Sequence, residues 1–142
     1  MKNPLFRMAA LLIALACFSA PALGETAASK NRVVMQVSDG DPAKWNLALN
    51  NARNLQADLG RDQVEIEIVA YGPGIGMLRR ESPVSSRIDE ALTAGVNVVA
   101  CENTMTGQKL TKSHMLPGIG YVRAGVVEIM QKQQQGYAYL RP

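Results

Sequence analysis

One stretch decides the fold: VVMQVSDGDP, residues 33–42. Its first half is short, apolar and β-branched, which is typical of a strand buried on both faces of a parallel sheet. The Ser-Asp-Gly that follows is a turn sequence. Asp41 then precedes Pro42, and an N-cap residue followed by proline at the first helical position marks the start of a helix. The chain therefore passes from a buried strand directly into a helix, as in α/β folds.

The helix that begins at Pro42 has apolar side chains three and four residues apart, so they share one face. That face consists of Trp45, Ala48, Leu49, Ala52, Leu55 and Leu59. Gly60 supplies a stop signal. The next segment, 64–70, begins with strict alternation of apolar residues and glutamates. We expect a strand with one solvated face, lying at or near an edge of the sheet.

Strands and helices continue to alternate to the end of the chain. We expect a loop at 71–76, a helix at 83–94, a strand at 96–100, a short helix near 106–113, a strand at 119–122, a helix at 124–135 and a strand at 137–140. Right-handed crossovers between such strands give a mainly parallel sheet with helices on both faces. The predicted fold is a three-layer α/β/α domain of four or five strands. Residues 25–31 are small and polar, and we expect a mobile arm there.

Residues 1–24 have the composition of a secretory signal peptide. Lys2 and Arg7 precede the apolar run 8–18, and small residues follow as far as Gly24, after which we expect cleavage. The apolar run is shorter than the roughly 17 to 25 residues of a membrane-spanning helix. We therefore expect a periplasmic protein without membrane attachment after cleavage. Lipidation at Cys17 is an alternative, although the usual leucine three places before the cysteine is missing.

The charge of the chain does not favour nucleic-acid binding. The 142 residues include 15 basic and 12 acidic side chains, for a net charge of +3. Two of the basic residues, Lys2 and Arg7, belong to the predicted leader, so the rest of the chain is almost neutral. It has no long basic stripe and few aromatic residues, which are the features that nucleic-acid-binding surfaces need.

Beyond the leader the sequence has one cysteine, Cys101, where the apolar run 96–100 gives way to polar residues. Ligand sites of parallel α/β folds lie at the carboxyl ends of strands, so Cys101 is the first candidate for chemistry. Three alternatives remain open: a buried inert thiol, a thiol paired with another chain, or a free functional thiol. Asn103 or Thr104 is expected to cap the next helix, whose N–H groups would stabilise a thiolate. The adjacent carboxylate of Glu102 would oppose one.

Two other turn segments end strands at the same predicted edge. Asp39 and Gly40 follow the first strand, and the loop Gly72-Pro73-Gly74 follows the second. The carboxyl ends of parallel strands gather at one edge of a sheet. We therefore expect these residues to line a cleft with Asn103 and Thr104, which is the default place for a ligand.

The lone histidine and two methionines each have an ordinary explanation beside a functional one. His114 would serve as a general base for Cys101, or it is a surface loop residue. Met105 and Met115 with Cys101 form a soft ligand set suited to copper(I), but methionine is more often a core residue. One histidine cannot build a multi-histidine site, and the spacing of the sulfur residues matches no firm ligand rule. We predict no metal site.

Two further patterns are weak. The glycines at 72, 74 and 76 resemble a dinucleotide fingerprint only superficially, because the full spacing before a helix is missing, so we predict no cofactor. Three arginines, Arg79, Arg80 and Arg123, would attract an anion such as a sulfur oxyanion, but solvated surface charges are the favoured explanation.

Several segments, taken in order, carry a resemblance to a known family. They are QVSDGD (36–41), WN (45–46) with NNARN (50–54), YGPG (71–74), GV (95–96) leading to ACENTM (100–105), and the ending GYAYLRP (136–142). Together these segments resemble the DsrE-like (DsrE/DsrF/YchN) family, in particular its small exported members. The resemblance covers residues 32–142, which we take as one DsrE-like α/β domain.

The resemblance implies a parallel α/β domain that assembles as a trimer or hexamer. In cytoplasmic members a cysteine after a central strand carries sulfur as a persulfide, and Cys101 is the matching position. A periplasmic sulfur-handling protein is therefore implied, in which Cys101 passes sulfane sulfur to a thiol partner as a carrier or relay rather than as an enzyme with turnover.

The predicted leader departs from the cytoplasmic pattern, so relay to tRNA or to dissimilatory sulfite reductase does not carry over. The alternative function is a non-enzymatic oligomeric module that binds a small ligand and has a structural Cys101.

Overall fold

The computed structural model describes residues 30–142. The predicted signal peptide, with Cys17, lies outside the described residues, as do residues 25–29 of the predicted arm. The first strand begins at Asn31, two residues earlier than expected, so Asn31 belongs to the sheet rather than to an arm. Within the described part of the chain, no helix has the length and apolar character needed to cross a bilayer.

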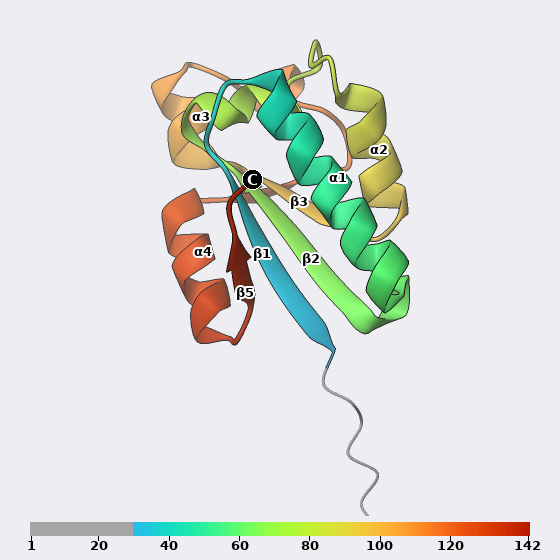
Figure 1. Ribbon diagram of the computed structural model, residues 1–142. Coiled ribbons are helices and arrows are strands. Elements are labelled where there is room, and N and C mark those ends of the chain that lie inside the picture. The colour runs from blue at the N-terminus through green and yellow to red at the C-terminus, as the bar shows by residue number, and fades with distance from the viewer. Residues whose placement is uncertain (1–29) are drawn as a thin grey trace, which may run out of the picture.

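Five strands alternate with helices in residues 30–142 (Figure 1). The strands are β1 (Asn31–Val37), β2 (Val64–Ala70), β3 (Asn97–Cys101), β4 (Gly120–Val122) and β5 (Ala138–Leu140). The helices are α1 (Pro42–Leu59), α2 (Ser85–Thr93), α3 (Glu102–Gly107) and α4 (Gly125–Gln134), with 3₁₀ turns η1 (Arg61–Gln63), η2 (Gly72–Leu78) and η3 (Lys112–His114). All neighbouring strands are parallel, in the order β4-β3-β2-β1-β5. The predicted α/β fold with a parallel sheet is confirmed.

The local signals at the two ends of α1 act as expected. The Asp41 carboxylate accepts a hydrogen bond from the N–H of Ala43 at 2.8 Å, and Pro42 occupies the first turn. The helix ends before Gly60, which has a φ of +89°. Glycine adopts this left-handed conformation without the steric cost that a side chain would add, so the chain can turn into η1 and β2.

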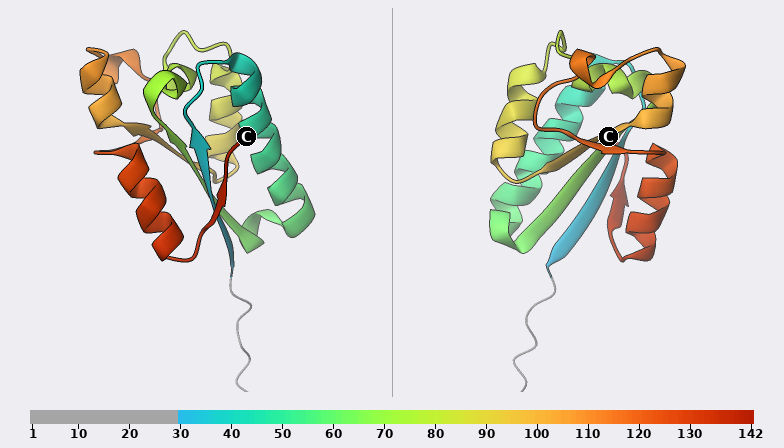
Figure 2. Two further views of the ribbon diagram at one scale, coloured as in Figure 1. Left: turned by 60° about the vertical axis from the view of Figure 1, so that its left-hand side comes forward. Right: turned by 180° about the vertical axis from the view of Figure 1, so that it is seen from behind.

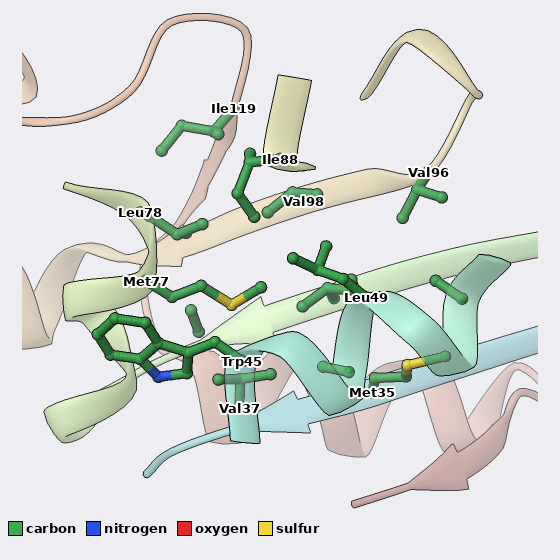
Figure 3. Packing of buried hydrophobic residues seen from close by; sticks show 14 of the residues in the cluster. Met35, Val37, Trp45, Leu49, Met77, Leu78, Ile88, Val96, Val98 and Ile119 are labelled. Carbon is green, nitrogen blue, oxygen red and sulfur yellow. The ribbon is translucent and has the colours of Figure 1, made fainter. Parts of the chain in front are cut away.

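Helices cover the two faces of the sheet unequally (Figure 2). On one face, α1 and α2 pack over a large apolar core, part of which is shown in Figure 3, with Trp45, Leu49, Ile88 and Val98 among its members. On the other face, α4 covers a smaller cluster of Val34, Val69, Val99, Ile129 and Tyr137. Since successive side chains of a strand point to opposite faces, every second residue of each strand faces α4.

β2 is the central strand, so the prediction that it lies at or near an edge is wrong. Its polar face is turned toward α4 rather than toward water. Glu67 is only 3% exposed, and its Oε2 lies 3.0 Å from Lys132 Nζ and 2.5 Å from Asn97 Nδ2. Glu65 accepts a hydrogen bond from the Tyr137 hydroxyl. Glu65 is exposed, whereas Glu67 is buried because α4 supplies the compensating cation.

The helix after Cys101 also differs from its predicted position near 106–113. It begins at Glu102, directly after β3, and Cys101 itself is the N-cap. Residues 112–114 form the separate turn η3. The prediction that Asn103 or Thr104 caps this helix is therefore wrong, because both residues lie inside its first turn. Short polar side chains are equally suited to that turn, where N–H groups have no partner within the helix. Boundaries elsewhere differ by one or two residues, and the predicted loop at 71–76 is largely the 3₁₀ turn η2.

Candidate functional site

Cys101 lies at the carboxyl end of β3, on the face of the sheet that α4 covers. Val99, two residues earlier, belongs to the apolar cluster under α4, so Cys101 points the same way. Its partner in register on β4 is Val122. The cysteine is a free thiol and is buried, with 5% of its surface exposed. The predicted position at a strand end is therefore confirmed, but the sulfur lies beneath the surface.

Backbone N–H groups from two helix starts surround the sulfur. The N–H of Gly125, the first residue of α4, donates to Sγ at 3.3 Å. The N–H groups of Asn103 and Thr104 in α3 also act to lower the pKa of the thiol, and that of Asn103 donates to the carbonyl of Arg123 at 3.1 Å. In the thiol form, S–H reaches the carbonyl oxygen of Arg123 at 3.9 Å. Donors at helix starts carry partial positive charge, which favours a thiolate over a thiol.

The hydroxyl of Thr104 is the side-chain group that acts most strongly to lower the pKa of Cys101. Its oxygen accepts a hydrogen bond from the N–H of Gly72 at 3.0 Å. Because the oxygen already accepts this bond, the hydroxyl proton remains available for Cys101. The loop that begins at Gly72 thus orients Thr104 rather than contacting the sulfur itself.

These contacts set the acidity of the thiol. Burial acts to raise the pKa of Cys101, but the hydrogen bond from the Thr104 hydroxyl and those from the backbone N–H groups of Gly125, Thr104 and Asn103 outweigh it. The pKa is therefore lower than that of an ordinary cysteine. Since the thiolate is the nucleophilic form, the site favours a reactive sulfur.

Replacing Thr104 by valine should slow the alkylation of Cys101. The substitution keeps the shape of the side chain but removes the donor to the thiolate, so the pKa of Cys101 should rise. A hydrogen bond to a charged group contributes about 1.5 kcal/mol or more, so we expect a decrease of about tenfold in rate at neutral pH. The rate with iodoacetamide as a function of pH measures this directly. Thr106→Val, on an exposed position of the same helix, serves as the control. Equal rates in the two variants would contradict the role given to Thr104.

The turn at 38–40 and the loop at 72–74 contact each other more closely than they contact Cys101. The N–H of Gly74 donates to the carbonyl of Ser38 at 3.2 Å, and a Cβ on Gly40 would lie 3.3 Å from Cβ of Pro73. Asp39 accepts a hydrogen bond from the Trp45 indole through its carbonyl, and its carboxylate pairs with Arg141 at 3.7 Å. Asp39 and Gly40 thus reach the thiol site only through the loop at 72–74.

The loops at 38–40 and 72–74 pack against each other through these contacts. A cavity of ≈ 400 Å³ lies between the end of β4 and α4. Its lining residues are Val122, Arg123, Ala124, Val127, Glu128 and Gln131.

His114, Met105 and Met115 have ordinary structural roles. His114 is exposed, and its Nδ1 accepts a hydrogen bond from the N–H of Thr111 at 2.9 Å, which closes the turn η3. Met105 and Met115 are 4% and 1% exposed and belong to the apolar core. Between residues 30 and 142, no group of three or more histidine, cysteine or acidic side chains is placed to hold a metal ion.

The three arginines do not converge on one anion site. Arg79 pairs with Glu81, and the guanidinium of Arg80 donates through Nε to the carbonyl of Ser113 at 2.7 Å. Arg123 lies apart from them and lines the cavity beside Cys101.

Sequence reasoning missed Gly125 as a contributor to the site. A Cβ on Gly125 would lie 3.1 Å from Cβ of Tyr71 and 3.2 Å from Cγ1 of Val69. The absence of a side chain lets the start of α4 approach the sheet closely enough for its N–H to reach Cys101. The available signal was a glycine at the first residues of a predicted helix, where the residue is otherwise unremarkable.

A second polar cluster, which we call the acid–lysine cluster, consists of Glu67, Asn97, Glu128 and Lys132. Lys132 Nζ lies 3.0 Å from Glu67 Oε2 and 3.9 Å from Glu128 Oε1. Burial raises the pKa of Glu128, and the nearby Glu67 carboxylate raises it further through repulsion and a hydrogen bond, while Lys132 acts in the opposite direction. Two carboxyl groups next to one ammonium group therefore favour a proton on Glu128.

The raised pKa of Glu128 makes a prediction about stability. A carboxyl group that binds its proton more tightly in the folded state stabilises the fold fully below its unfolded pKa. This stabilisation is lost as the pH rises through the folded pKa. Glu128→Gln cannot titrate, so wild type should lose stability relative to this variant as the pH rises above the ordinary value of 4.5. Urea unfolding of both proteins between pH 4 and pH 8 tests the sign, and parallel curves would contradict it.

The chain matches the sequence profile of the DsrE/DsrF-like family over residues 31–142. A solved structure of a protein of unknown function from Methanobacterium thermoautotrophicum, MTH1491, is 38% identical in sequence, with a TM-score of 0.76. The match covers 80% of this chain and 100% of that one. A search of curated proteins gave no sequence match.

Two more distant structures share the fold. One is a conserved protein of unknown function from Bacteroides thetaiotaomicron, BT1422, with 16% identity and a TM-score of 0.63, covering 79% of this chain and 95% of that one. The other is the ychN protein from E. coli, with 13% identity and a TM-score of 0.61, covering 80% of this chain and 99% of that one.

Proposed function

This chain belongs to the DsrE/DsrF-like family, and from that premise we propose that it is a periplasmic sulfur-handling protein of the small exported branch. In this proposal Cys101 accepts sulfane sulfur as a persulfide and passes it to another thiol. The observation that carries the proposal is the set of hydrogen-bond donors near Sγ, namely the Thr104 hydroxyl and backbone N–H groups of α3 and α4, which lower the pKa of Cys101 despite its burial. A structural cysteine needs no such set of donors.

The proposed reaction is an exchange of sulfur without net oxidation. The Cys101 thiolate attacks the outer sulfur of a donor R–S–SH, a new sulfur–sulfur bond forms, and the donor leaves as R–S⁻. The terminal sulfur keeps its proton. A thiolate acceptor then attacks the outer sulfur of the Cys101 persulfide in the same way and regenerates the Cys101 thiolate. The N–H groups of Gly125, Asn103 and Thr104 stabilise the thiolate at the start and end of this cycle.

Assembly and export are part of the same proposal. Three apolar side chains of α4, Val126, Val127 and Met130, are 59%, 42% and 49% exposed. Exposed apolar side chains grouped on one helix are typical of a protein interface, which supports the trimer or hexamer implied by the resemblance. Light scattering of the purified protein tests the oligomer. Cell fractionation tests export directed by residues 1–24.

Cys101→Ser should abolish sulfur loading. In a Cys17→Ser background, Cys101 is the remaining thiol of the chain, so loading has one place to occur. After incubation with inorganic polysulfide, mass spectrometry should show the mass of one added sulfur atom on this protein and none on the variant that also carries Cys101→Ser. Equal loading of both proteins would rule the proposal out.

The alternative, a ligand-binding module with a structural cysteine, gains support from the 5% exposure of Cys101. It predicts a thiol that does not react with polysulfide or iodoacetamide until the protein unfolds. The two functions therefore give opposite results in the native state, and the loading experiment separates them.

A further inference from the structure

The cavity between β4 and α4 lies next to the Cys101 thiol. Val122, which lines it, pairs in register with Cys101, so the two side chains are neighbours on the same face of the sheet. Arg123 and Ala124 also line it, and the Sγ atom lies 3.9 Å from the Arg123 carbonyl oxygen. The volume of ≈ 400 Å³ is within the range of about 300 to 1,000 Å³ that small-molecule sites occupy.

The depth of the thiol restricts what can react with it. Folded proteins meet over broad surfaces of about 800 Å² on each partner. A cysteine on such a surface does not readily reach Cys101, which is only 5% exposed and whose sulfur accepts a hydrogen bond from the start of α4. The cavity is lined by Val122 and Arg123, which neighbour Cys101 in the sheet and through the Arg123 carbonyl, so a small molecule seated there would lie beside the residues that flank the thiol. The geometry thus favours a low-molecular-weight partner over the cysteine of a rigid protein surface.

The walls of the cavity have a distinctive chemistry. Arg123, an exposed residue, supplies a guanidinium group suited to a carboxylate. Gln131 supplies an amide, and Val122 and Val127 supply apolar surface.

Glu128 completes the lining and contacts Glu67, whose buried Oε1 otherwise has no partner. Arg123 is the one cation among the lining residues, so it is the group there that would attract an anionic ligand.

We propose that this cavity binds a carboxylate-bearing low-molecular-weight thiol, and that the persulfide of this molecule is the sulfur donor for Cys101. The inference rests on the proposed function of Cys101 and names its partner. The donor R–S–SH places its outer sulfur beside the Cys101 thiolate, its own sulfur–sulfur bond breaks, and R–S⁻ remains in the cavity until it takes a proton from water. The reverse exchange unloads Cys101 onto the same class of thiol.

Binding is tested without any transfer of sulfur. The full chain carrying Cys17→Ser and Cys101→Ser is labelled with ¹⁵N and titrated with reduced glutathione, a tripeptide thiol with two carboxylates. Saturable shifts of backbone amides between residues 122 and 131 are expected. 2-Mercaptoethanol, a thiol without a carboxylate, should cause none at the same concentrations. Arg123→Glu should abolish the glutathione shifts.

Two glutamines of α4 provide a matched pair of variants. Gln131→Trp fills the cavity and should weaken glutathione binding at least tenfold. Gln133→Trp places the same side chain at an exposed position outside the cavity and should change the affinity by less than twofold. Equal effects of the two substitutions would overturn the assignment of the site.

The proposal and the function on which it rests can fail separately. If inorganic polysulfide loads Cys101 but glutathione gives no saturable shifts at 122–131, the small-thiol site is overturned and the proposed function stands. If glutathione binds as expected, its persulfide should load Cys101, and Gln131→Trp should slow that loading at least tenfold. Binding without loading by the persulfide would overturn the exchange.

Discussion

Gly74→Ala should be among the most destabilising single substitutions in this domain. A Cβ at this position would lie 2.2 Å from the carbonyl oxygen of Val37 and 2.6 Å from its carbon, and both are backbone atoms that no rotamer change can move. The turn η2 must therefore shift away from the end of β1. We expect a loss of about 3 kcal/mol, the upper part of the range for overpacking.

Chemical denaturation measures this loss, and the same experiment has a matched control. Gly107→Ala, at the end of α3, has open space around the new methyl group, and alanine there should be neutral or slightly stabilising. Displacing η2 also moves the N–H of Gly72 away from Thr104, so alkylation of Cys101 should slow in any Gly74→Ala protein that folds. A loss of less than 1 kcal/mol would show that the loop at 72–74 is not held as described.

Lys132→Ala should be the second large effect, because it removes the cation from a buried carboxylate. Glu67 is 3% exposed, and Lys132 Nζ is its close ionic partner at 3.0 Å. Breaking a buried ion pair by removing one partner costs about 3 to 5 kcal/mol, mostly because the remaining charge has lost its compensation. The substitution also removes the ammonium group from above the ring of Tyr137, where it lies 4.8 Å from the centroid.

Two comparisons separate charge from packing in this prediction. Lys44→Ala, on an exposed position of α1, should change the stability by less than about 0.5 kcal/mol. Adding Glu67→Gln to Lys132→Ala removes the uncompensated charge and should restore a substantial part of the loss. If the double variant is less stable than Lys132→Ala alone, the ion pair is not the cause.

The fold was predictable because its signals are local. The passage from an apolar strand through Ser-Asp-Gly to Asp41 and Pro42 needs no knowledge of the rest of the chain, and the same kind of alternation recurs to the C-terminus. The position of Cys101 at the end of β3 follows from the same local pattern.

What could not be predicted depends on contacts between distant segments. The alternation of Glu65 and Glu67 is the same for an edge strand and for a central strand that faces a lysine, and Lys132 lies far along the chain. Likewise, the N–H of Gly125 reaches Cys101 only because α4 returns across the sheet from β4.

Helix α4 makes one polar contact with the sheet near each of its ends. The N–H of Gly125 donates a hydrogen bond to the sulfur of Cys101, and two turns later Lys132 forms an ion pair with Glu67 on the central strand. The ion pair of Lys132 therefore helps to hold the N–H of Gly125 in place, although the two residues do not touch. We expect the pKa of Cys101 to depend on this ion pair. The pKa of Cys101 therefore reports whether the C-terminal half of α4 stays attached to the sheet.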